Sequence, residues 1–179
     1  MVILLLSQPN ILFMKPFSIA DSILIKLVTV IGCLLILFSA NVALAEDYDK
    51  QIMTGYDFSG KVLKGSQFNK TDLRKALFKN ADLKGVSLFG ANMTGADFSG
   101  ADMSYSTLDT ARMDEVNLTN TILEGSFVYG ASFNRVTIDG ADFTDVDLRD
   151  ITREKLCKVA QGKNPVTGRS TRETLECDD

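Results

Sequence analysis

A five-residue period runs through most of this 179-residue chain and restricts its fold more than any other feature. When blocks of five are cut from Tyr56, the third residue of each block, from Phe58 to Leu148, is large and apolar in all nineteen blocks. The first residue is Ala, Ser, Thr or Val in seventeen of the nineteen. Helices repeat every 3.6 residues and flat strands every two, so neither buries this pattern. The period therefore predicts a stacked solenoid.

Each block predicts a short extended step followed by a bend. The first and third residues are two apart and point to one side, while the second, often Asp or Asn, points outward. Gly, Asn, Asp and Lys are frequent at the fourth and fifth positions, where the chain must turn. Nineteen inward side chains contribute about 2 kcal/mol each on burial. The body is therefore expected to fold without a cofactor.

Several blocks resemble the A-(D/N)-L-x-x motif of the pentapeptide-repeat proteins, among them ADLKG at 81–85, ANMTG at 91–95 and ADFSG at 96–100. The resemblance covers residues 51–150. It implies an all-β solenoid, a right-handed quadrilateral β-helix with four blocks to a coil, in which each residue stacks on the residue twenty positions later. One inner column then contains Phe58, Phe78, Phe98, Leu118 and Ile138.

The first 45 residues are unlike the repeat, since 31 of them are hydrophobic. Residues 27–40 carry no charge, Lys26 precedes them and Ala43-Leu44-Ala45 follows. A basic flank, a short apolar run and a small-x-small site are typical of a secretory signal peptide. The run is shorter than the roughly 20 residues of a membrane-spanning helix. We therefore predict a signal peptide over 1–45, cleaved after Ala45; an uncleaved anchor is the alternative, and Met14 is an alternative start to Met1.

The period ends after Asp150, so the repeat domain is assigned to 46–150 and a C-terminal cap to 151–179. Residues 151–161 have helix-forming composition, and Gly162 is a stop signal. Ser170-Thr171-Arg172-Glu173 fits a capping box that opens a second short helix. Because the last coil of a solenoid needs a cover, a short α-helical C-terminal cap is expected here.

Cys157 and Cys177 are the two cysteines that remain after the predicted cleavage. In an exported domain such a pair indicates a disulfide, and two separate thiols are the alternative. The segment LCKVAQGKNPVTGRSTRETLEC at 156–177 follows a signal peptide and pentapeptide coils. In this combination the chain is similar to the thylakoid-lumen pentapeptide-repeat proteins of cyanobacteria and plants. The resemblance implies a disulfide-capped rod in the thylakoid lumen, with the periplasm as the alternative compartment.

Five apolar side chains occupy outer positions where the repeat predicts polar residues. Phe89 and Tyr129 share one outer column with Phe127 on the same face, and Ile122 and Tyr105 fall on the neighbouring face. Exposed aromatic side chains on one side indicate a protein-binding surface. These five residues are therefore the candidate interaction patch; packing against the cap, or scattered surface residues, are the alternatives.

Composition limits the chemistry of the chain. With no histidine, a Ser-His-Asp triad and an imidazole-bound zinc site are excluded. A net charge of −4 argues against a nucleic-acid binder, which needs a basic surface. Asp82, Asp102 and Asp142 share an outer column, but they belong to the repeat pattern. No catalytic, cofactor-binding or metal-binding residue is predicted.

The function expected from these features is a non-enzymatic structural or interaction module with an unidentified protein partner and no stable membrane span after signal cleavage. One alternative is the DNA-mimic branch of the family, whose acidic rods bind DNA gyrase. Residues 86–150 carry eleven acids and three bases, which suits a mimic, but residues 56–85 carry seven bases and three acids, which does not. A weak metal-binding or enzymatic role is the other alternative.

Overall fold

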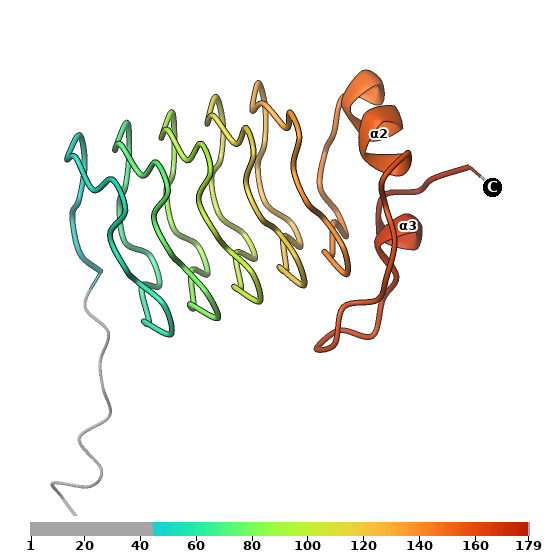
Figure 1. The fold of residues 1–179 in the computed structure, drawn as a ribbon, viewed down its shortest axis with the longest axis horizontal. Coiled ribbons are helices and arrows are strands. Elements are labelled where there is room, and N and C mark those ends of the chain that lie inside the picture. The colour runs from blue at the N-terminus through green and yellow to red at the C-terminus, as the bar shows by residue number, and fades with distance from the viewer. Residues whose placement is uncertain (1–44, 179) are drawn as a thin grey trace, which may run out of the picture. The chain divides into compact units, whose positions relative to one another are not determined.

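The structure is a computed structural model that describes residues 45–178. The predicted signal peptide lies outside these residues except for Ala45, so its cleavage stays a prediction. Within the described part, successive coils lie side by side and two short helices follow the last coil (Figure 1). The coils span 46–65, 66–85, 86–105, 106–125 and 126–145.

Parallel bridges fix the register of the coils. They join the second residues of blocks twenty positions apart, from Asp47–Gln67 to Ile122–Asp142. The N–H of Phe78 donates to the carbonyl of Asp97 at 2.7 Å, and the N–H of Asp97 donates back to the carbonyl of Ala76 at 3.0 Å. The twenty-residue register is therefore formed, with four blocks in each coil.

A left-handed residue ends each block. Every fifth residue from Lys50 to Asp145 has a positive φ, and ten of these twenty residues are not glycine. The next N–H closes a turn, as Ala81 does by donating to the carbonyl of Phe78 at 3.1 Å. A positive φ at the third turn residue is typical of a type II turn. Glycine adopts it freely, whereas other residues lose roughly 1 to 2 kcal/mol.

The Asp and Asn side chains at the second position have a local role. Asp97 Oδ1 accepts the N–H of Ser99 at 3.0 Å, and Asn117 Oδ1 accepts that of Thr119 at 3.0 Å. The fourth residue's N–H is the one that neither the turn nor the neighbouring coil uses. Outward direction alone therefore does not account for these residues, because their side chains also satisfy a backbone donor.

The inner columns fill the interior. All third-position residues from Phe58 to Leu148 are buried except Phe133, which is partly buried. The Phe78 ring stacks on Phe58 at 4.8 Å and on Phe98 at 4.6 Å between centroids. The inner column predicted from Phe58 to Ile138 is therefore confirmed as a buried stack.

Two helices follow the coils: α2 (Asp150–Cys157) and α3 (Thr171–Thr174). α2 is shorter than the predicted helix over 151–161, because the chain must leave it for the carbonyl of Gln161 to accept the N–H of Gly140 at 2.9 Å. Ser170 caps α3 as predicted, its Oγ accepting the N–H of Glu173 at 3.1 Å. No helix within residues 45–178 is long and apolar enough to cross a membrane.

We predict that Phe78→Ala lowers the free energy of unfolding by about 3 to 5 kcal/mol, because it leaves a cavity between two stacked rings. The exposed residue Phe127 offers a matched control, and Phe127→Ala is expected to change stability by less than about 0.5 kcal/mol. Urea denaturation of both variants measures the difference. Equal losses would contradict the stacked column.

Candidate interaction surface

Four of the five candidate residues are exposed. Phe89 is 41% exposed, Tyr105 62%, Phe127 62% and Tyr129 79%. Each occupies a second, fourth or fifth position of its block, and these positions point away from the filled interior. We call these four residues the aromatic surface.

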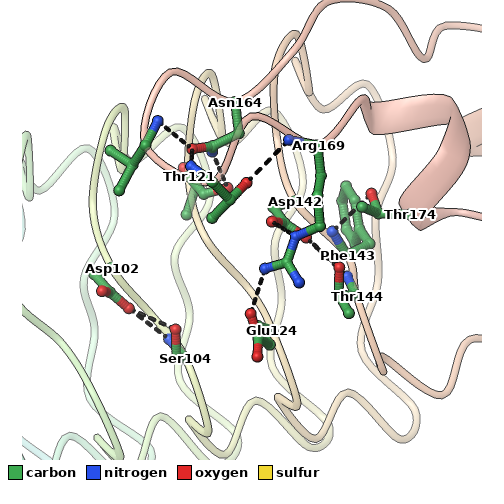
Figure 2. Close-up of polar contacts among 12 residues, drawn as sticks. Asp102, Ser104, Thr121, Glu124, Asp142, Phe143, Thr144, Asn164, Arg169 and Thr174 are labelled. Atoms are coloured by element: carbon green, nitrogen blue, oxygen red, sulfur yellow. Dashed lines mark hydrogen bonds and ion pairs between the residues drawn. The ribbon is translucent and has the colours of Figure 1, made fainter.

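Ile122 does not belong to this surface, because it is only 8% exposed. The loop at 163–170, here called the cap loop, lies across the face that carries it. Asn164 of this loop donates to the carbonyl of Thr121, and Arg169 pairs with Glu124 (Figure 2). The prediction that Ile122 is an exposed patch residue is therefore wrong, and packing under the cap is the reason.

A shallow hollow of about 170 Å³ lies between two of the exposed rings. Phe127, Tyr129 and Gly125 line it, and Asp109, Asp145 and Asp147 surround them. The Tyr105 ring lies over Gly125, since a Cβ added there would meet two ring carbons at 2.8 Å. The lack of a side chain at Gly125 thus brings Tyr105 next to the hollow.

Phe89 is set apart from the hollow. Its outer column continues through Asp109 to Tyr129, so an acidic residue separates the two aromatic rings. Asp109 Oδ1 accepts the N–H of Tyr129 at 2.7 Å. The structure therefore brings Phe127 and Tyr129 together at the hollow, places Tyr105 over the neighbouring Gly125, and leaves Phe89 outside it.

Asn164 anchors the cap loop to the last two coils. Its Nδ2 donates to the carbonyls of Asn120 at 3.1 Å and Gly140 at 3.0 Å, and its Oδ1 accepts the N–H of Val166 at 3.0 Å. The residue is 1% exposed, so these bonds replace water at a buried amide. Asn164-Pro165 reads only as a turn signal in the sequence, and nothing there identifies this anchor.

Arg169 forms the second anchor. Its guanidinium binds Glu124, and its Nε donates to Asp142 Oδ2 at 2.7 Å (Figure 2). Asp142 is fully buried, and burial would raise the pKa of its carboxyl. Hydrogen bonds from two threonine side chains and from Arg169 outweigh burial, so this pKa lies below that of an ordinary aspartate.

The other acids of the same column are also paired. Lys64 reaches Asp82, and Lys84 reaches Asp102, each at 3.0 Å. Each lysine is at a fourth position and its partner is at a second position of the next coil. Such half-exposed pairs contribute little to stability individually. Within the described residues, no group of three or more Cys, Asp or Glu side chains is placed to hold a metal ion.

A disulfide joins the two helices of the cap. Cys157 ends α2, and its sulfur is bonded to that of Cys177 beyond α3, with the Cα atoms 5.6 Å apart. Arg172 adds a bond from its guanidinium to the carbonyl of Cys157 at 3.1 Å. The pairing predicted from the cysteine count is formed, and the alternative of two separate thiols is not.

Comparison with known proteins agrees with this architecture. Residues 66–104 and 111–150 match the description Pentapeptide repeats, in eight copies. A solved pentapeptide repeat protein from the Arabidopsis thaliana thylakoid lumen is 48% identical, with a TM-score of 0.72 over 74% of this chain and 92% of that one. This chain belongs to the pentapeptide-repeat family. Pentapeptide-repeat proteins form right-handed quadrilateral β-helices.

Two curated relatives in Arabidopsis thaliana are similar to parts of this pentapeptide-repeat protein. Thylakoid lumenal 15 kDa protein 1 is 61% identical over 46 residues, which are 26% of this chain and 20% of that protein. Thylakoid lumenal protein TL20.3 is 48% identical over 40 residues, which are 22% of this chain and 14% of that protein. The matched segments are thus a fifth or less of the length of these relatives.

We predict that the double variant Cys157→Ser, Cys177→Ser lowers the free energy of unfolding by about 3 kcal/mol, because the disulfide closes a loop of about 20 residues. Thermal denaturation with and without a reductant measures this. Reduction should lower the melting temperature of the wild type and leave that of the double variant unchanged. An unchanged wild-type melting temperature would refute a stabilising role.

The lowered pKa of Asp142 predicts a pH-dependent contribution to stability. This contribution is present above the unfolded aspartate pKa of about 3.9 and is lost as the pH falls through the lower folded-state pKa. Asp142→Asn should therefore lower the unfolding free energy by about 2 kcal/mol at pH 7, and by less at pH 3. Asp150→Asn, at a side chain 94% exposed, is the control. Urea denaturation at both pH values measures these losses. If Asp142→Asn loses as much unfolding free energy at pH 3 as at pH 7, the prediction fails.

Proposed function

We propose that this chain is an exported, non-enzymatic rod that acts as a protein-interaction module in the thylakoid lumen or the periplasm. The observation that carries the proposal is the aromatic surface: four exposed rings on coils whose interior is already filled by apolar side chains. The solved lumenal relative supports the compartment, because the likeness to it extends over 74% of this chain.

The aromatic surface is suited to binding because its backbone is held in place before a partner arrives. Thr107 and Phe127 are bridged, and Tyr129 is tied to Asp109 by its N–H. A rigid ring loses little conformational entropy on association, so aromatic residues commonly dominate binding energy at the centre of interfaces. Surface rings of this kind favour an interaction role over catalysis.

The charge around the rings favours a partner that presents Lys or Arg. Asp109, Asp145 and Asp147 line the hollow that also exposes Phe127 and Tyr129. Opposite charges increase the association rate and the specificity of an interface, and a cation over an aromatic face adds attraction. A basic protein surface with an apolar centre is the complement.

The distribution of charge gives the DNA-mimic alternative little support. A mimic needs a continuous acidic surface, whereas here Lys64, Lys79 and Lys84 each pair with an aspartate of the next coil. These pairs neutralise acids of the middle coils, at Asp82, Asp97 and Asp102. We therefore retain the interaction module as the single proposal.

Crosslinking in intact thylakoids followed by mass spectrometry tests the proposal. The double variant Phe127→Ser, Tyr129→Ser should reduce the yield of the main crosslinked partner at least tenfold without changing the melting temperature. Val166→Ser and Ile151→Ser remove exposed apolar side chains elsewhere and should leave the yield unchanged. Equal yields from all variants would show that the aromatic surface does not bind the partner.

A further inference from the structure

The last coil has four blocks, one on each face of the solenoid, and the residues that follow cover each block in a different way. On the block 136–140, the carbonyl of Gln161 takes the place of a next coil by accepting the N–H of Gly140. On the block 141–145, Thr174 Oγ1 accepts the N–H of Phe143 at 3.0 Å. The segment 146–149 lies over the block 126–130, with Leu148 buried. Neither this block nor the block 131–135 has a backbone acceptor for its third- and fifth-position N–H groups among residues 45–178, and above the block 131–135 a groove separates the coil from α2.

The backbone edge of the block 131–135 is therefore open. In the coil before it, the N–H of Met113 donates to the carbonyl of Ser132 at 3.1 Å, and the N–H of Glu115 donates to the carbonyl of Asn134 at 2.8 Å. The corresponding N–H groups of Phe133 and Arg135 have no acceptor among residues 45–178, and the carbonyl of Ala131 has no donor there. A row of free donors and acceptors at strand spacing is able to pair with another strand.

A groove of about 470 Å³ lies along this open edge. Its apolar lining comes from Phe133 and Val136 of the coil, from Leu156 of α2 and from Val159 just beyond that helix. Phe133 is the third-position residue of the last coil that remains only partly buried. α2 thus stands away from this face by enough to leave room for a further segment above Phe133.

We propose that this groove binds an extended segment of a partner protein, which adds one block beyond the last coil. The proposal rests on the interaction function proposed above and names a second surface for it. The N–H of the segment's second residue donates to the carbonyl of Ala131, and the carbonyl of the same residue accepts from the N–H of Phe133. The carbonyl of the segment's fourth residue accepts from the N–H of Arg135. The third side chain, apolar, packs between Phe133 and Val159. This is strand addition at a sheet edge, with a pocket that selects the side chain.

Charge at the groove favours an acidic residue after the apolar one. Two bases, Arg135 and Lys155, line the groove with one acid, Asp114, whose Oδ1 already accepts from the amide of Asn134. Arg135 already binds Glu115 of the preceding coil at 2.5 Å, which shows that a fifth-position carboxylate reaches it from the adjacent block. A segment with a carboxylate one or two residues after its apolar residue would place that charge near Arg135 and Lys155, where attraction adds to the backbone pairing.

A blocked peptide with the sequence of residues 110–116 has this pattern, with Met followed by Asp and Glu. Titrated into the ¹⁵N-labelled full chain, it should produce saturable amide shifts at Phe133, Arg135 and Val159. The same peptide with an N-methyl group on its second-position Arg loses the donor to Ala131 and should bind at least tenfold more weakly. Val159→Lys narrows the groove and should weaken binding at least tenfold, whereas Val166→Lys, on the cap loop, should not.

Equal binding of the N-methylated peptide, or shifts confined to the first coil or to the aromatic surface, would overturn the proposal. Absence of saturable shifts at millimolar peptide would do the same. The proposed function fails separately, through the crosslinking yield of the Phe127→Ser, Tyr129→Ser variant. Loss of that yield together with an inert groove would leave the interaction module in place and remove only the strand-addition site.

Discussion

The backbone N–H groups of each five-residue block need hydrogen-bond acceptors, although the coils form neither a continuous helix nor long strands. The rest of the structure depends on which groups accept these hydrogen bonds. Within the stack, one N–H of a block closes the turn and three bond to neighbouring coils. Where the second residue is Asp or Asn, its side chain accepts the fourth-position N–H of the same block. This assignment requires a left-handed fifth residue and a twenty-residue register. The buried columns follow from it, because stacked blocks place third residues directly over one another.

The surfaces that remain available for binding arise where this bonding scheme stops or is interrupted. The coils end at residue 145, where the cap accepts N–H groups of two blocks, at Gly140 and Phe143, and leaves a groove above Phe133. Near the same end, Gly125 has no side chain, so the Tyr105 ring lies over it beside the hollow that Phe127 lines. The groove and the hollow therefore both lie on the last two coils, whereas Phe89 and Tyr105 of the aromatic surface lie on the coil before them.

The repeat could be predicted from the sequence because its information is local and periodic. A third-position Phe78 is buried whatever its neighbours are, and Ser170 caps a helix through a residue three positions away. Contacts of the cap were not predictable in the same way. Arg169 meets Glu124 and Asp142 across 45 and 27 residues, and no period relates them. Ile122 was misplaced for the same reason, since the loop that buries it lies about forty residues further along.

The anchors of the cap loop also change how the end of the solenoid can open. Asn164 and Arg169 each bond to the fourth coil, at Asn120 and Glu124, and to the fifth, at Gly140 and Asp142. In a solenoid whose coils contact only their neighbours, the terminal coil can detach alone. Here the last coil cannot separate unless bonds to the coil beneath it also break. We therefore expect the fourth and fifth coils to open as one cooperative unit, so that a partner bound to either coil stabilises both.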